Sequence, residues 1–210
     1  MQVTVFGASG KVGQKVVQKL LSNGYDVVAF THNSAVAEAD RLTIAHGDIH
    51  SLRDVIEAVK GSEVVISAVG SWGTKEKDIV SKGIDNIISA MITNKTRRVI
   101  SLTGSDAIDS SDKHSSLSSL MHALINLSPA RKILQDGEKH IELLKNSNLD
   151  WTVLRSPVMT NSGDSGKYEL VLRRPKPWAT INRQSVAEAM VSLIDDRSYY
   201  KKAPFIQRTK

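Results

Sequence analysis

The sequence predicts an α/β fold in which a doubly wound parallel sheet carries helices on both faces. Two observations lead to this prediction. Short apolar runs rich in β-branched residues alternate with stretches whose apolar residues recur at helical spacing, which is the pattern of βαβ units. The first run also ends in a glycine-rich turn that opens directly into the first helical stretch.

Six runs are predicted to be buried strands, because each is short, apolar and bounded by Gly, Ser, Asn or Asp. They cover residues 3–6, 27–30, 42–45, 64–68, 99–102 and 151–154. Apolar residues at helical spacing predict two helices that lie on this sheet. These residues are Val12, Val16, Val17, Leu20 and Leu21 in the first helix, and Val80, Ile84, Ile87 and Met91 in the second. Gly24 is predicted to end the first helix, and Gly61 to end a further helix over 55–59, each in the left-handed conformation.

The second half departs from this alternation. A serine-rich stretch follows the fifth strand, and residues 104–127 are predicted to form a lid, because a long insertion at this place is usually a binding loop. An amphipathic helix is predicted over 133–145 and a last helix over 186–194. Between them the chain after Pro157 is predicted to be irregular, with 157–182 forming a small C-terminal cap on the substrate side. Residues 1–210 are thus predicted to form one domain.

Composition excludes several kinds of site. The 210 residues contain no cysteine, which excludes a disulfide framework, a thiolate zinc site, a cysteine nucleophile and an iron–sulfur cluster. The six histidines show no spacing with carboxylates that makes a zinc site persuasive, so no metal is expected. There is no signal-peptide pattern and no apolar run of the roughly 20 residues that would span a bilayer. A cytoplasmic protein without a membrane partner is expected.

The charge is distributed as on a solvated surface. The chain has 28 basic and 22 acidic residues, a net charge of +6. Most basic residues alternate with acids, as in the stretch 75–78, and the excess is late, at Arg173, Arg174, Lys176 and the C-terminal residues. This arrangement is more typical of a solubilising surface than of a nucleic-acid groove, so no nucleic-acid partner is expected.

The turn after the first strand carries the clearest chemical signal. It reads Gly7-Ala8-Ser9-Gly10-Lys11-Val12-Gly13. Gly7 permits a tight turn, Gly10 lets backbone amides approach a pyrophosphate, and Gly13 allows close helix–strand packing. Between a strand and a helix this run predicts the dinucleotide site of a Rossmann-type fold, with contacts from Gly7, Ser9, Gly10, Lys11, Val12 and Gly13. Val12 stands where a P-loop would have Ser or Thr, which excludes that motif.

The end of the second strand indicates which dinucleotide binds. An acid at this place normally accepts hydrogen bonds from the ribose of NAD, but the strand runs into Thr31-His32-Asn33. Thr31 and Asn33 can donate to a 2′-phosphate, and His32 can become cationic. The sequence therefore favours NADP over NAD, with an ordinary polar loop as the alternative.

Residues after the third and fourth strands complete the predicted cofactor contacts. They are Asp48, Ile49, Ala68, Val69 and Gly70. The carboxylate of Asp48 could accept from the adenine amino group, with a helix N-terminal acid as the alternative. Small side chains at 68 and 70 would let the cofactor lie over the strand ends. Trp72 is predicted to edge the substrate pocket, with packing on the next helix as the alternative.

Four stretches of the sequence together resemble the atypical short-chain dehydrogenase/reductases. They are the glycine run, Gly47-Asp48, the segment Leu149-Asp150-Trp151-Thr152-Val153-Leu154-Arg155-Ser156-Pro157 and the segment 181–187. The resemblance spans essentially the whole chain. It is strongest to the NmrA-like and biliverdin reductase B/flavin reductase-like NAD(P)-binding family. It implies an active-site hydroxyl after the fifth strand, for which Thr103 and Ser105 are the nearest candidates, and it puts Pro157 on the substrate side.

The chain departs from the classical members of that superfamily, which use a tyrosine and a lysine four residues on to transfer a proton. Its tyrosines are Tyr25, Tyr168, Tyr199 and Tyr200, and the residues four positions later are Ala29, Leu172, Ala203 and Pro204. The histidine that often follows the proline in the reductase branch is replaced by Val158-Met159. His114 and His122, in or beside the predicted lid, are candidate donors on the substrate side, with a solvated histidine as the alternative.

These features predict an NADPH-dependent oxidoreductase that reduces a flat conjugated small molecule such as a flavin or a quinone. Flavin accepts a hydride at a ring nitrogen and can take its proton from water, so a fixed acid is not required. The first alternative is an NmrA-like regulator that senses the dinucleotide without turnover and acts through a protein partner. The second is a sugar-nucleotide epimerase or dehydratase, against which the missing tyrosine argues.

Overall fold

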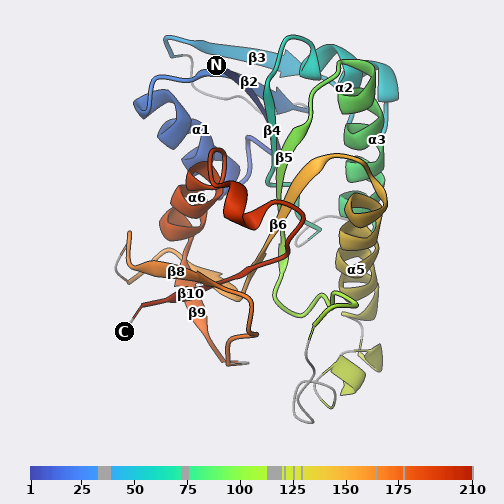
Figure 1. Ribbon diagram of the computed structural model, residues 1–210, viewed down its shortest axis with the longest axis vertical. Coiled ribbons are helices and arrows are strands. Elements are labelled where there is room, and N and C mark those ends of the chain that lie inside the picture. The colour runs from blue at the N-terminus through green and yellow to red at the C-terminus, as the bar shows by residue number, and fades with distance from the viewer. Residues whose placement is uncertain are drawn as a thin grey trace.

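The computed structural model describes residues 1–32, 39–71, 76–112, 120, 122–124, 126–128, 130–163, 165–176 and 178–209. Its centre is an eight-stranded sheet in the order β3-β2-β1-β4-β5-β6-β10-β8 (Figure 1). Every neighbouring pair is parallel except β10 and β8, which are antiparallel. The chain order reverses between β1 and β4, which makes this the point where ligands bind in open α/β sheets.

The predicted strands and helices are confirmed with small shifts at their ends. The strands are β1 (Gln2–Phe6), β2 (Asp26–Thr31), β3 (Leu42–His46), β4 (Val64–Ser67), β5 (Arg98–Gly104) and β6 (Asp150–Ser156). The helices are α1 (Gly13–Ser22), α2 (Leu52–Val59), α3 (Ile79–Thr93), α5 (Arg131–Asn146) and α6 (Arg183–Ser192). Gly24 and Gly61 have φ angles of +82° and +77°, which confirms that these helices end in the left-handed conformation.

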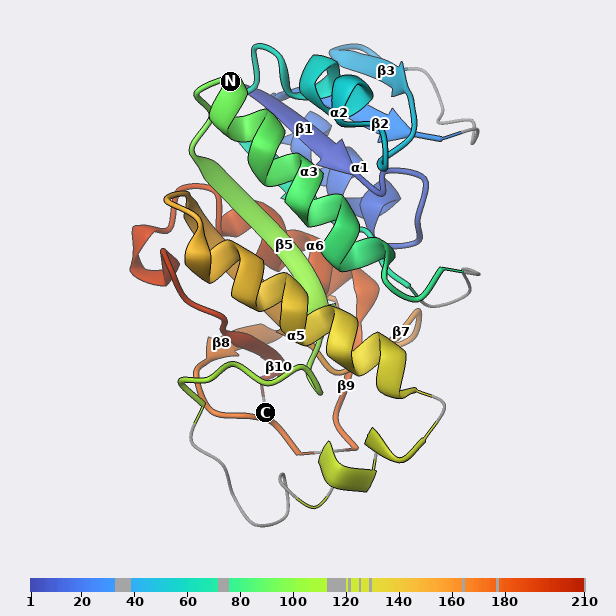
Figure 2. The same cartoon turned by 90° about the vertical axis from the view of Figure 1, so that its right-hand side faces the viewer.

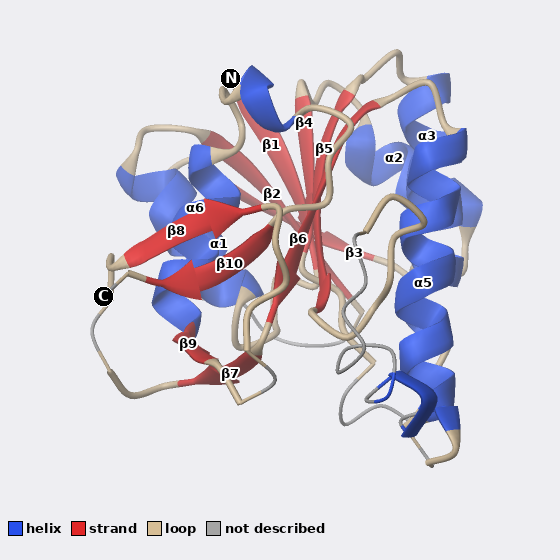
Figure 3. Ribbon diagram, turned by 60° about the horizontal axis from the view of Figure 1, so that its bottom comes forward, coloured by secondary structure: helices blue, strands red, loops and turns tan. Residues whose placement is uncertain are grey.

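Helices cover both faces of the sheet, as predicted. Figure 3 shows α1 and α6 on one side and α2, α3 and α5 on the other. Alternate residues of each strand enter separate apolar cores. Val3 and Val5 of β1 pack towards α1 and α6, whereas Phe6 and Val65 belong to the core beneath α2, α3 and α5. Helices on both faces explain why the strands read as nearly continuous apolar runs.

The prediction of an irregular chain after Pro157 was wrong. Two short strands, β7 (Val158–Thr160) and β9 (Thr180–Asn182), pair in parallel as a separate small sheet. β8 (Tyr168–Val171) and β10 (Phe205–Arg208) extend the central sheet beyond β6, and a 3₁₀ turn (Arg197–Tyr199) precedes β10. Each of these strands has only three or four residues, and pairing between segments far apart in the chain leaves no local periodic signal.

Two absences concern only the part of the chain that the structure describes. None of its helices is long and apolar enough to cross a membrane. Nor does it contain a group of three or more His, Cys, Asp or Glu side chains that could hold a metal ion.

Candidate dinucleotide site

The glycine turn after β1 is built by close backbone contacts. Gly7 has a φ of +74°, and its carbonyl accepts a hydrogen bond of 3.0 Å from the backbone N–H of Gly10. A Cβ on Gly13 would overlap the Gly7 carbonyl oxygen, and a Cβ on Gly7 would lie 2.8 Å from the backbone of Ala68. Side chains at these two positions are therefore excluded by backbone atoms that cannot move aside.

The N-terminus of α1 offers donors suited to an anion. Among the described residues no side chain caps this end of the helix, and its first turn contains no acid. Lys11 is exposed just before the helix, and Gln14 donates from its side chain to the carbonyl of Ser9 at 3.0 Å. Uncapped N–H groups at the positive end of a helix dipole are the donor set that a pyrophosphate requires. The residues present therefore fit a dinucleotide.

The end of β4 lies directly beside this turn. The N–H of Ala68 continues the ladder by donating to the carbonyl of Phe6 at 2.9 Å. Gly70 is exposed, and no described atom lies within 4 Å of the place where its Cβ would be. The structure thus brings the predicted residues of the glycine turn and Ala68 to Gly70 together at the carboxyl edge of the sheet, where α1 and α3 begin (Figure 2).

The two described residues at the end of β2 differ in the polar groups that they leave available to a ligand. Thr31 is buried, and its hydroxyl lies 3.3 Å from Nδ1 of His46, so it already has a polar partner. His32 is exposed, and its Nδ1 lies 3.3 Å from the carbonyl oxygen of Gly47. That contact orients the ring from one side and leaves Nε2 without a partner among the described residues. Asn33, Trp72 and His114 lie outside the described residues.

Asp48 forms a local turn before α2. Its carboxylate accepts from the N–H of His50 at 2.9 Å, and its own N–H donates to Asp54 at 3.0 Å. The cap of α2 is Ser51, which accepts from the N–H of Asp54. Ile49 contacts the position that a Cβ on Gly83 would occupy. A role for Asp48 and Ile49 at the adenine stays a prediction.

The two candidate hydroxyl residues, Thr103 and Ser105, lie at the end of β5. A Cβ on Gly137 of α5 would lie 2.7 Å from the Thr103 hydroxyl, so this group faces α5. Ser105 is half-buried, and its N–H donates to the carbonyl of Ser156 at 2.8 Å. Pro157, which follows, is buried. The substrate-side roles of these residues remain predictions.

The first part of the predicted lid is held in place, which sequence reasoning missed. We call residues 105–112 the strap. Arg155, 2% exposed in β6, donates from both terminal nitrogens to Asp112, at 2.7 Å for the Nη2 bond, and lies over the Phe205 ring at 3.7 Å. Lys145 of α5 pairs with the buried Asp109. Burial alone would raise the pKa of Asp109, but the hydrogen bonds from Lys145 and Ser111 lower it.

Two histidines contact α5 and its neighbours. His122 lies 2.7 Å through Nε2 from the carboxylate of Glu138, which also accepts from the N–H of Ile108. His140 of α5 is buried, with Nε2 2.8 Å from the hydroxyl of Ser101 and no partner for Nδ1 among the described residues. Burial lowers the pKa of His140 to about 4. No spacing in the sequence pointed to the pair of Ser101 and His140.

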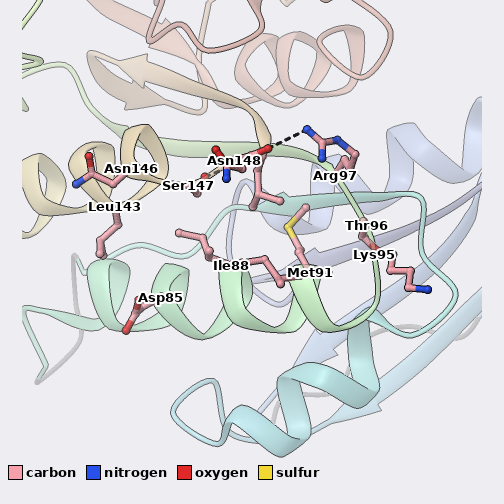
Figure 4. Close-up of a pocket in the computed structure, with 12 residues that line it drawn as sticks. Asp85, Ile88, Met91, Lys95, Thr96, Arg97, Leu143, Asn146, Ser147 and Asn148 are labelled. Carbon is pink, nitrogen blue, oxygen red and sulfur yellow. Dashed lines mark hydrogen bonds between the residues drawn. The ribbon is translucent and has the colours of Figure 1, made fainter.

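One hollow lined by described residues is at the opposite, amino-terminal edge of the sheet. It has a volume of about 580 Å³ and lies between the C-terminal halves of α3 and α5 (Figure 4). Its lining includes Ile88, Met91, Leu143 and the polar residues Lys95, Arg97 and Asn148. None of the predicted cofactor contacts is among its lining residues, so the predicted dinucleotide site is formed by exposed backbone at strand ends and not by this cavity.

The sequence pattern of a family described as NAD(P)H-binding matches residues 7–197. Two curated relatives match different shares of this chain. A 2-alkyl-3-oxoalkanoate reductase of Shewanella oneidensis is 28% identical over 102 residues, which cover 46% of this chain and 26% of that protein. The UPF0659 protein YMR090W of Saccharomyces cerevisiae is 22% identical over 217 residues, covering 96% of this chain and 91% of its own.

Solved structures match over nearly the whole chain. The oxidoreductase ylbE of Lactococcus lactis has a TM-score of 0.81 at 17% identity, covering 100% of this chain and 92% of its own. A short-chain dehydrogenase/reductase of Veillonella parvula in complex with NADP has a TM-score of 0.80 at 18% identity, covering 99% and 94%. ChuY, an anaerobilin reductase of Escherichia coli O157:H7, has a TM-score of 0.77 at 18% identity, covering 100% and 98%. At these identities the likeness shows the fold, which confirms the predicted fold class.

Proposed function

This chain belongs to the NAD(P)H-binding family, and from that premise we propose that it is an oxidoreductase that uses NADPH to reduce a flat conjugated acceptor such as a flavin or a quinone. Family membership confirms the predicted class of cofactor, whereas the preference for NADPH and the acceptor belong to the proposal. The observation that carries it is the backbone cradle from Gly7 to Gly13, with an uncapped helix end at the switch point of the sheet.

The residues around this cradle have separate binding roles. Backbone N–H groups at the start of α1, with the exposed Lys11, hold the pyrophosphate. His32 lies where a 2′-phosphate would distinguish the two dinucleotides. The small residues Ala68 and Gly70 leave room over the strand ends. When bound, the nicotinamide would supply the hydride.

The choice of acceptor follows from what the chain does not offer. No tyrosine in the sequence is followed by a lysine four residues on, and the Thr103 hydroxyl faces α5. A simple ketone would need a placed donor for its developing alkoxide. A flat conjugated acceptor needs only alignment against the nicotinamide. Ser105 then helps to position the acceptor, and replacing it with Ala should lower kcat more than it changes dinucleotide affinity.

The test follows the loss of NADPH absorbance after adding FMN, a quinone or biliverdin. Gly10→Asp should weaken dinucleotide binding about a hundredfold, because it brings like charges together. Gly10→Ala is the matched control: its Cβ would lie 3.2 Å from the Gly7 carbonyl, so it adds bulk without charge and should lose much less affinity. Tight dinucleotide binding without turnover of any acceptor would contradict the reductase and favour a regulator.

A further inference from the structure

Exposed large apolar side chains gather at one end of the molecule. Two segments, 120–132 and 172–178, carry five of them, which are between 53% and 87% exposed. These are Leu120, Leu124, Leu127, Leu172 and Trp178. Both the helical turn around Ala123 and the loop between β8 and β9 lie at the lower end of the longest axis in Figures 1 and 2. We call this surface the apolar end.

The leucines of the first segment share one helical face. Leu120, Leu124 and Leu127 are spaced by four and three residues, and the N–H of Leu127 donates to the carbonyl of Ala123. His122, on a different face, pairs with Glu138 of α5. The turn is therefore attached to the protein through His122, while its leucines are exposed.

The charge at the apolar end has one sign. Neither segment contains an Asp or a Glu. Arg131, Lys132, Arg173 and Lys176 are exposed. In the neighbouring strap, Asp109 and Asp112 are already paired with Lys145 and Arg155, and Asp106, whose carbonyl accepts from Arg174, is the exposed acid. The ammonium group of Lys176 lies 5.8 Å from the centre of the Trp178 ring, so a cationic and an aromatic side chain lie next to each other on this surface.

Apolar and cationic side chains combined in this way suit the headgroup region of an anionic bilayer. Leucine and tryptophan enter the boundary between headgroups and acyl chains, while lysine and arginine pair with anionic lipids. We propose that the apolar end docks this protein on an anionic lipid surface.

Peripheral docking of this kind needs no spanning segment. The sequence-based expectation of no membrane partner rested on the absence of such a segment. That absence does not exclude binding to the membrane surface. The docking stands apart from the proposed reductase activity. It would bring the carboxyl edge of the sheet, where β7 and the strap lie, close to acceptors that dissolve in lipid.

The experiment measures sedimentation of the full chain with phosphatidylcholine vesicles and with equimolar phosphatidylglycerol and phosphatidylcholine vesicles. The protein should partition onto the anionic vesicles, less so as salt is raised. Trp178 fluorescence should shift to shorter wavelength as the indole leaves water. Because the readout is binding alone, its outcome does not depend on whether any acceptor is reduced.

Matched variants separate the apolar from the ionic contribution. Leu127→Ser with Trp178→Ser should lower the partition constant about tenfold or more, whereas Leu52→Ser with Ile92→Ser, also exposed, should leave it unchanged. Arg173→Gln with Lys176→Gln should weaken binding more than Lys201→Gln with Lys202→Gln. All variants change exposed residues, and thermal melting checks that they fold.

Three results would overturn the proposal. The first is no binding of the wild type to anionic vesicles. The second is an equal loss in the control pair Leu52→Ser with Ile92→Ser. The third is binding that depends on Arg173 and Lys176 but not on Leu127 and Trp178, because that would indicate a soluble polyanion such as nucleic acid.

Discussion

The connection from β1 to α1 and the connection from β5 to α5 leave the same edge of the sheet, yet different parts of the chain hold them. The first is a short turn fixed by backbone atoms, with Gly7, Gly13 and Ala68 in direct contact. The second begins with the strap, which is fixed by side chains from β6 and α5, chiefly Arg155 and Lys145.

The difference matters for what each connection can do. A turn fixed by its own backbone leaves N–H groups at the start of α1 available for a ligand. In the strap, the carboxylates of Asp109 and Asp112 are instead paired within the protein. Helix packing differs in the same way. α1 packs on the sheet with Val16, Val17 and Leu20, whereas α5 buries His140 against Ser101 of β5.

Replacing Gly13 with Ala should cause the largest loss of stability, because it disrupts the turn that backbone atoms hold in place. The added Cβ would overlap the Gly7 carbonyl, so β1 and α1 would have to separate. We expect a loss of more than about 4 kcal/mol in the free energy of unfolding, measured by urea denaturation. Gly104→Ala is the control, since no described atom lies within 4 Å of its Cβ position. A wild-type stability for Gly13→Ala would show that the turn is not packed in this way.

Replacing Arg155 with Leu tests the connection from β5 to α5, which is held by side chains. It would leave Asp112 without its buried partner, and breaking such a pair costs about 3 to 5 kcal/mol. Adding Asp112→Asn should recover part of the loss, because the uncompensated charge is removed. Equilibrium denaturation of the two single variants and the double variant gives the coupling. If the losses of unfolding free energy in the two single variants add up to the loss in the double variant, the strap is not held by this ion pair.

These two variants also show what sequence could predict. The glycine turn is a local pattern, so its three glycines, Gly7, Gly10 and Gly13, stand within seven positions and could be found. Arg155 and Asp112 stand 43 positions apart, Lys145 and Asp109 stand 36 apart, and no periodicity connects them. Likewise Asp136 of α5 accepts from the N–H of Val80 and of Ser81 at the start of α3, 55 or more positions away. The strands were predictable because helices bury both faces, whereas the short strands after Pro157 were not.

Acid should affect the second connection through His140. Because burial disfavours the imidazolium, the pKa of His140 in the folded protein is about 4, below the ordinary 6.5. The unfolded chain therefore binds this proton first as the pH falls. Stability from this group is complete above about pH 6.5 and declines towards pH 4, by up to about 3 kcal/mol.

The measurement compares urea denaturation at several pH values between 4 and 7 for the wild type, His140→Gln and the control His32→Gln. The first variant should lose much of the pH dependence in this window, whereas the second, at an exposed ring, should keep it. Equal slopes for the wild type and His140→Gln would mean that other groups cause the acid sensitivity.

The smallest effect concerns the one place near the first connection where a side chain is proposed to decide binding. His32 is exposed and is oriented through Nδ1 towards the Gly47 carbonyl. Its Nε2 has no partner among the described residues, so it can contact a 2′-phosphate. Replacing His32 with Ala should therefore weaken NADPH binding a few-fold, since an exposed contact of this kind is weak. The affinity for NADH, which lacks this phosphate, should change little.

Dissociation constants for both dinucleotides should be measured for the wild type, His32→Ala and the control His50→Ala, whose ring pairs with Glu76 at 2.7 Å. Only His32→Ala should lower the preference for NADPH. If the preference survives in His32→Ala, or if the wild type prefers NADH, selection does not reside in this side chain. The cradle would then bind the dinucleotide through its backbone alone.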